Sequence, residues 1–303
     1  MTINAKAFFS DEREKKAYVE EAELRFETAL DSAVLDLLAD GCERIITLSG
    51  PTCAGKTTAA SKLVRELSER GKHVQVVSLD DFFYGRKILD EKARSKGLDI
   101  DFDSPDAIDF EALSSAVSDI LKGNSIRMPI FNFKKGERDG YRSFTPSKDD
   151  VFLFEGIQAI YPEVTALLDG HAYRSIYISV QSGIRQGDAC FEPHTVRLAR
   201  RLVRDYLFRG AGPDFTFFLW ESVRQNEEKN ILPYAHTANV TLDTTLPYEM
   251  SMLKPYLMPL LDQIGETDLY YHSAKKLRQQ IEHVAEIDVS YLPEHSLYHE
   301  FLG

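Results

Sequence analysis

Short runs of β-branched and aromatic residues alternate with longer stretches of helical spacing through the middle of the chain. Apolar runs bounded by polar residues are typical of buried strands. Strands that alternate with helices favour a parallel sheet with helices on both faces, so the pattern predicts an α/β core. The runs are RIITLS, HVQVVSLD, DVFLFEG, RSIYISV and NVTLDT, and the helical stretches include SKLVRELSERG and DAIDFEALSSAVSDILKG.

The two ends of the chain differ from the middle in their pattern of apolar and polar residues. Residues 1–43 are charged and carry an imperfect apolar face at helical spacing, which predicts a helical N-terminal appendage that Gly41 could end. Helical spacing returns beyond the last apolar run, so we expect a helical C-terminal extension over residues 248–303. Residues 44–247 then form the core.

Composition narrows the class of protein. A chain of 303 residues that is 43% hydrophobic can bury a full core, and its net charge of −12 disfavours binding to a nucleic acid polymer or an anionic membrane. The cysteines Cys42, Cys53 and Cys190 are too few and too scattered for a disulfide framework or a zinc site. No stretch approaches the roughly 18 apolar residues that span a bilayer. We therefore expect a soluble cytoplasmic protein with no membrane partner, in which any phosphate site is a local exception to the acidic surface.

A glycine-rich motif follows the first apolar run and opens a helix. It fits GxxxxGK[ST], and its glycines let backbone N–H groups curl around a phosphate. Lys56 would reach the β- and γ-phosphates, the Thr57 hydroxyl would bind Mg²⁺, and Thr58 would add a contact to the α-phosphate. The alternative, an ordinary strand-to-helix turn, does not explain the agreement of strand, spacing and helix. The motif consists of Gly50, Pro51, Thr52, Cys53, Ala54, Gly55, Lys56 and Thr57.

Carboxylates follow the next two strands. Asp80 and Asp81 end the run HVQVVSLD, at the sheet edge where α/β sites assemble. Asp80 could accept a hydroxyl proton or bind Mg²⁺, although paired aspartates after a strand also serve as helix caps or turn formers. Glu155 ends the run DVFLFEG and could orient Mg²⁺ or hold the base. These residue types at this edge predict phosphoryl-transfer chemistry.

The segment VRLARRLVRDYLFRG breaks the acidic background, because its arginines gather around a single acid, Asp205. Such a cluster can be a solvated helix face. Beside a phosphate loop it predicts a lid, around residues 182–215, whose guanidinium groups bridge and close over the transferring phosphates. We expect Arg200 to contact the nucleotide and Arg201 and Arg204 to act in catalysis. The arginines are Arg197, Arg200, Arg201, Arg204 and Arg209.

Several motifs occur in the order found in the uridine kinase and phosphoribulokinase family. They include GPTCAGKTT, SLDDFF, DFDSPDAIDFEAL, PIFNFKKGER, DVFLFEGIQAIYPEV and RLARRLVRDYLFRG. Over about residues 44–250 the chain resembles this family, and most of all its longer bacterial uridine kinase-like nucleoside kinases. The resemblance implies a P-loop α/β fold with a parallel five-stranded sheet and a mobile lid. It also implies ATP- and Mg²⁺-dependent transfer of a γ-phosphoryl group to a small-molecule acceptor, typically the 5′-hydroxyl of a nucleoside such as uridine or cytidine, and a homo-oligomer.

The resemblance assigns roles to individual residues. Asp80 matches the aspartate that serves as the base, and Lys56 and Thr57 match the phosphate and Mg²⁺ residues. Arg201 and Arg204 match lid arginines. The residues expected to contact the acceptor are Asp81, Phe83, Tyr84, Phe131, Phe133, Arg138 and Arg209.

The chain departs from the family pattern in the acceptor region. Phe83 stands where a tyrosine is usual, with Tyr84 one place later. In FNFKKGER, Phe131 and Asn132 replace a Tyr-Asp pair, and Gly136 takes the place of a base-contacting histidine. The transfer residues are thus retained better than those that read a pyrimidine, which leaves the acceptor open.

Two alternatives follow from these departures. Lys134, Lys135 and Arg138 in the acceptor loop could receive an anionic substrate, which would make the protein a kinase of a sugar phosphate or another metabolite. Loss of the base-contacting residues is also compatible with an ATP-binding regulatory protein whose acceptor site has decayed.

Overall fold

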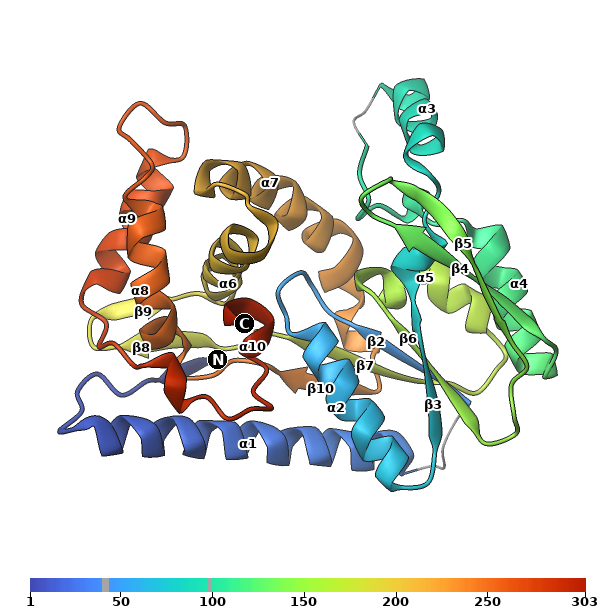
Figure 1. Ribbon diagram of the computed structural model, residues 1–303, viewed down its shortest axis with the longest axis horizontal. Coiled ribbons are helices and arrows are strands. Elements are labelled where there is room, and N and C mark those ends of the chain that lie inside the picture. The colour runs from blue at the N-terminus through green and yellow to red at the C-terminus, as the bar shows by residue number, and fades with distance from the viewer. Residues whose placement is uncertain (40–43, 98–99) are drawn as a thin grey trace.

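The computed structural model describes residues 1–39, 44–97 and 100–303 (Figure 1). Its centre is a five-stranded sheet in the order β10-β7-β2-β6-β3, in which all neighbouring strands are parallel. The predicted apolar runs form these strands, so the predicted parallel sheet is confirmed. The strands are β2 (Ile45–Ser49), β3 (His73–Ser78), β6 (Asp150–Glu155), β7 (Arg174–Ser179) and β10 (Val240–Asp243).

Helices cover both faces of this sheet, as predicted (Figure 1). Successive residues of β2 face opposite ways. Ile45 belongs to one buried cluster with α4 (Phe110–Lys122), whereas Ile46 belongs to a second cluster with α2 (Lys56–Glu69) and α6 (Pro193–Arg209). The runs of β2 and β6 are apolar over consecutive residues because both faces of these strands are buried, whereas the edge strand β3 is partly exposed.

The N-terminal region contains the predicted helix, α1 (Glu12–Leu38). The helix begins at Asp11, whose side chain accepts a hydrogen bond from the Glu14 amide at 2.9 Å. Its apolar face packs against β10 and α2 and joins the same core. The predicted helix end at Gly41 and the residue Cys42 lie outside the described residues. The division of the chain into residues 1–43, 44–247 and 248–303 remains a prediction.

Two further sheets were not predicted. β1 (Thr2–Asn4) pairs in parallel with β8 (Gly183–Gln186), which pairs antiparallel with β9 (Ala189–Phe191). β4 (Ile126–Asn132) and β5 (Glu137–Phe144) form an antiparallel hairpin from the segment expected to be an acceptor loop. The hairpin lies beside the β3 edge of the central sheet (Figure 1).

The C-terminal region is helical, as predicted. α6 packs against both α8 and the terminal helix α10, so the end of the chain lies beside the arginine-rich helix. No helix within the described residues is both long and apolar enough to cross a membrane. The remaining helices are α3 (Arg86–Lys96), α5 (Pro162–Thr165), α7 (Pro213–Asn226), α8 (Glu249–Leu261), α9 (Tyr271–Glu282) and α10 (His299–Leu302).

Candidate functional site

The glycine-rich loop joins the end of β2 to the start of α2. Gly55 immediately precedes the helix with φ +86°, and an added Cβ there would lie 2.4 Å from Leu297. Both the backbone angle and the contact require glycine. Cys53 also has a left-handed backbone, with φ +57°. The Lys56 ammonium group donates a hydrogen bond to the Pro51 carbonyl at 3.0 Å, so the lysine folds back over its own loop.

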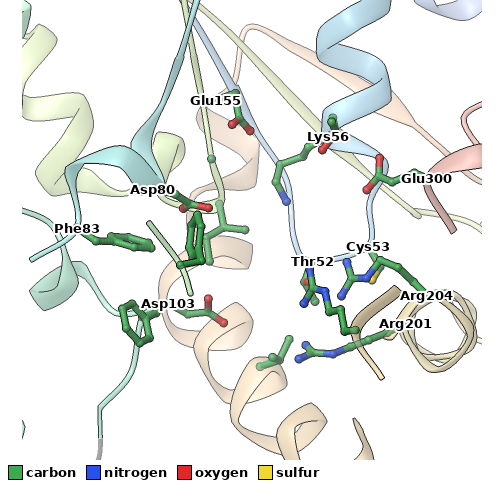
Figure 2. Close-up of a pocket in the computed structure, with 17 residues that line it drawn as sticks. Thr52, Cys53, Lys56, Asp80, Phe83, Asp103, Glu155, Arg201, Arg204 and Glu300 are labelled. Carbon is green, nitrogen blue, oxygen red and sulfur yellow. The ribbon is translucent and has the colours of Figure 1, made fainter. Parts of the chain in front are cut away.

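A cavity of about 630 Å³ opens in front of this loop (Figure 2). It brings together residues from the loop, from the ends of β3 and β6, from the β4–β5 hairpin and from α6. The predicted site residues that line it are Thr52, Cys53, Lys56, Thr57, Asp80, Phe83, Phe133, Glu155, Arg201, Arg204 and Arg209.

Asp80 and Glu155 meet at the carboxyl edge of the sheet, because β3 and β6 are neighbouring parallel strands that end together. Burial raises the pKa of Asp80 to about 7, and the negative charge of Glu155 adds to the effect, while Lys56 opposes it. Desolvation lowers the pKa of Lys56, against the pull of nearby carboxylates. A carboxylate that titrates near neutrality in a cavity is a candidate proton acceptor.

The donor atoms here fit Mg²⁺. The Thr57 hydroxyl and the carboxylates of Asp80 and Glu155 supply hard oxygen ligands to one cavity, and the like charges of the two carboxylates favour a divalent cation. Within the described residues, no three His, Cys, Asp or Glu side chains form a metal cluster. Proteins commonly hold Mg²⁺ through one or two carboxylates together with water and substrate phosphates, and Asp80 and Glu155 supply two carboxylates to this cavity.

The first arginines of α6 lie beneath the glycine-rich loop. Arg197 pairs with Glu227 and donates to the Thr52 carbonyl at 3.2 Å. Arg200 pairs with Glu249 and donates to the Cys53 carbonyl at 3.2 Å. These arginines therefore have acidic partners other than Asp205, and they hold the backbone of the loop.

This geometry corrects the expected role of Arg200. The side chain has no exposed surface and does not line the cavity, so it does not reach a nucleotide there. Its charge, which suggested a phosphate contact, is instead balanced by Glu249.

The remaining arginines of α6 converge on Asp205. Arg201 and Arg204 lie 3.1 and 2.7 Å from its carboxylate oxygens, and Arg209 lies 3.5 Å away. All three line the cavity, and Figure 2 shows Arg201 and Arg204 on the side opposite Asp80 and Glu155. The helix itself is packed in the core, with Val196 and Leu202 fully buried, and the mobile lid around residues 182–215 remains a prediction.

Aromatic side chains form the wall near Asp80. Phe83 and Phe102 line the cavity with ring centroids 5.6 Å apart. Phe133 is exposed and also lines the cavity. Phe131 lies behind this wall and makes edge contacts at 5.8 Å to Phe83 and 5.2 Å to Phe133. The wall can pack against a flat apolar group.

Other predicted acceptor residues do not line the cavity. Asp81 accepts a hydrogen bond from the Phe131 amide at 3.0 Å and so fixes the hairpin. Arg138 pairs with Asp109 at 2.9 Å, and the Tyr84 ring lies under the ammonium group of Lys92. The structure gives these side chains partners of their own, and their contact with the acceptor remains a prediction.

Several loop residues also stay outside the cavity. Gly50 is in contact with β7, where an added Cβ would lie 2.1 Å from the Ile178 carbonyl oxygen. Pro51 and Ala54 are buried. Thr58 contacts the carboxylate of Glu300 from the far end of the chain.

The structure adds cavity residues that sequence reasoning missed. Burial raises the pKa of Asp103 to about 6, with a further contribution from Asp101. Asp103 and Phe102 belong to DFDSPDAIDFEAL, a motif that carries the resemblance to the family. The sequence therefore pointed to this segment but not to these two residues within it. Glu300 had no local signal. The added residues are Phe102, Asp103, Ile157, Val223 and Glu300, and Gly156, after the β6 carboxylate, also lines the cavity.

The parallel sheet, the glycine-rich loop before α2 and the carboxylates at the ends of β3 and β6 define a P-loop nucleotide-binding α/β protein. The sequence profile of the Phosphoribulokinase / Uridine kinase family matches residues 45–247, more than half of the chain. The protein belongs to this family.

Individual relatives agree with the family. The chain is 32% identical over 173 residues to Uridine kinase of Schizosaccharomyces pombe, covering 55% of this chain and 33% of that one. It is 28% identical over 199 residues to Uridine-cytidine kinase B of Dictyostelium discoideum, covering 65% and 73%. The chain thus spans only about a third of the S. pombe relative. Among solved structures, a putative fructose transport system kinase from Silicibacter sp. has 22% identity and a TM-score of 0.47, covering 71% of this chain and 98% of that one.

Proposed function

We propose that the protein is an ATP- and Mg²⁺-dependent kinase that transfers the γ-phosphoryl group to a hydroxyl of a small molecule, most specifically the 5′-hydroxyl of a nucleoside such as uridine or cytidine. One observation carries this proposal. A single cavity joins the P-loop lysine, a carboxylate whose pKa is raised to about 7, and an aromatic wall. Those are the parts that hold a triphosphate, accept a proton and pack against a base.

In the proposed reaction, the acceptor oxygen bonds to the γ-phosphorus while the bond from that phosphorus to the β,γ-bridging oxygen breaks and ADP leaves. The hydroxyl proton passes to the ionised form of Asp80, which is substantially populated near neutral pH. Arg201 and Arg204 face the cavity and would stabilise charge that moves onto the leaving oxygen. When bound through Thr57 and Glu155, Mg²⁺ would neutralise phosphate charge.

A nucleoside acceptor is favoured by the wall opposite the P-loop. Phe83, Phe102 and Phe133 offer flat apolar surface for a base. The Asp103 carboxylate lines the same cavity and could accept hydrogen bonds from ribose hydroxyls.

The sugar-phosphate alternative has less support, because its cations are engaged elsewhere. Lys135 pairs with Asp139, Arg138 pairs with Asp109, and neither lysine of the hairpin lines the cavity. Transfer of a phosphoryl group to a neutral small-molecule acceptor at the P-loop does not require these cations. The homo-oligomer and the cytoplasmic location remain predictions.

The decisive experiment measures ADP release from ATP and Mg²⁺ in the presence of uridine, cytidine, other nucleosides, sugar phosphates and hydroxy acids, with products identified by mass spectrometry. We expect a nucleoside 5′-monophosphate from the wild type and none from Lys56→Met. A phosphorylated sugar phosphate among the products would show that the acceptor is a sugar phosphate and not a nucleoside. Tight ATP binding with no product from any acceptor would contradict the kinase proposal and favour a regulatory protein.

A further inference from the structure

The last helical turn of the chain and the residues just before it pack beside the phosphate-binding loop. Leu297 is fully buried and packs directly on Gly55, as the close approach to an added Cβ shows. Tyr298 and Phe301 are also fully buried, and both rings lie beneath the Arg200 guanidinium. The segment is therefore core structure beside the loop.

Buried hydrogen bonds fix the backbone of this segment. Ser296 donates to the Glu23 carboxylate on α1. Tyr298 donates to the Glu249 carboxylate at 2.9 Å, on the start of α8. These two bonds hold the backbone that leads into Glu300 from two sides.

Glu300 projects from α10 toward the loop that carries Lys56 (Figure 2). Its Oε2 atom lies 3.4 Å from both the Thr58 amide nitrogen and the Thr58 hydroxyl. Thr58 is in the first turn of α2, where amide N–H groups have no partner within the helix and attract anions. A carboxylate thus occupies an anion-binding position of the P-loop.

We propose that Glu300 is an autoinhibitory competitor for the nucleotide, whose carboxylate takes a phosphate position at Thr58 and must rotate away before the nucleotide binds. The inference rests on the proposed nucleotide site. A phosphate and a carboxylate repel each other and cannot share the same donors. Leu297 would stay packed on Gly55 during this exchange, so binding would move one side chain and leave the wall of the site intact.

The test is the dissociation constant for ATP and ADP, measured by calorimetry, for the wild type, Glu300→Gln and Glu286→Gln. Glutamine keeps the shape of Glu300 and removes its charge, so we expect the dissociation constant to fall by about tenfold. Glu286 is the matched control, because its exposed carboxylate lies on the same C-terminal region and pairs with Lys254, away from the loop. Its variant should bind like the wild type.

Other outcomes separate this inference from the proposed function. If the wild type binds nucleotide, Lys56→Met does not, and Glu300→Gln binds with unchanged or lower affinity, the competitor role is wrong and the nucleotide site stands. Lower affinity would make Glu300 a ligand of the nucleotide instead. If neither the wild type nor Glu300→Gln binds nucleotide at millimolar concentration, the nucleotide site and the inference fail together. Thermal unfolding of Glu300→Gln checks that the variant is folded.

Discussion

Arg200 and Glu249 form an ion pair in which neither side chain has exposed surface, with 2.6 Å between Arg200 Nε and Glu249 Oε2. The pair joins α6 to the start of α8, and Arg200 also holds the Cys53 carbonyl of the P-loop. A charge that is buried without its partner is costly, so the two residues depend on each other. The shape of the phosphate loop thus depends on an acid that never meets the phosphate.

Glu249→Gln should strongly destabilise the protein, because it leaves the Arg200 charge buried without a counter-charge. We expect the free energy of unfolding to fall by about 3–5 kcal/mol, measured by urea denaturation. Asp262→Asn removes a partly exposed partner of Arg278 and should cost less than about 1 kcal/mol. Equal effects of the two variants would contradict the importance of the buried pair.

Asp80→Asn should abolish phosphoryl transfer and leave nucleotide binding nearly intact. Asparagine keeps the size of the side chain but cannot take the hydroxyl proton, so we expect turnover to fall at least about a hundredfold. Acceptor-dependent ADP release and the ATP dissociation constant measure the two effects separately. Asp90→Asn, on an exposed pair with Arg94, is the control and should turn over normally. Normal turnover in Asp80→Asn would remove Asp80 from the role of base.

Asp205→Asn should lower the turnover rate through the arginines that it holds. The carboxylate contacts Arg201, Arg204 and Arg209, and without its charge these guanidinium groups repel one another and lose their alignment. We expect kcat to fall about tenfold or more, with a smaller change in the ATP dissociation constant.

Glu228→Gln, which removes an exposed partner of Arg224, provides the comparison for Asp205→Asn. It makes the same change of charge on α7's C-terminal side, and kcat should stay at the wild-type value. A folded Asp205→Asn protein with unchanged kcat would show that Asp205 does not position the arginines.

Asp103→Asn should stabilise the protein above pH 6. Burial raises the folded-state pKa of Asp103 from 3.8 to about 6, so the folded state holds this proton more tightly than the unfolded state. The wild type therefore loses stability from this group as pH rises from about 4 to about 6, and loses no more above that range. The asparagine variant lacks this loss. The difference between the two melting temperatures should grow mainly over the same range.

Melting curves of both proteins from pH 4 to pH 8 test this expectation. Titrating groups that do not interact with Asp103 are common to both proteins and cancel in the difference. The charge of Asp103 also helps to raise the pKa of Asp80, so the difference should grow slightly further as Asp80 titrates near pH 7. A difference in melting temperature that is constant over the whole range would show that Asp103 titrates as an ordinary exposed carboxylate.

The central sheet and the phosphate loop could be predicted because their signals are local. A strand buried on both faces is apolar over consecutive residues, and GxxxxGK[ST] requires only correct spacing between a strand and a helix. Asp80 and Glu155 each follow a predicted strand. Because parallel strands end at one edge of the sheet, their positions also predicted that the two carboxylates lie at the same edge. These relationships need no knowledge of distant contacts.

The rest of the site depends on partners that are remote in sequence. The arginine segment reads as a uniform positive helix, yet Glu227 and Glu249 neutralise part of it from separate elements. The acceptor segment reads as a loop, because Pro129 and Gly140 interrupt the pattern of the hairpin that it forms. Nothing in the sequence around Glu300 predicts that its side chain lies beside Thr58. Tertiary packing decides each of these positions.

The pairing of β1 with β8 determines when the first strand can form as the chain is synthesised. The first strand, Thr2–Asn4, must wait for its partner, Gly183–Gln186, to leave the ribosome before it can form. The P-loop waits longer, because Gly55 meets Leu297 only when the last turn has been made. A nascent chain would therefore carry a complete phosphate motif before the neighbours that shape it have been made.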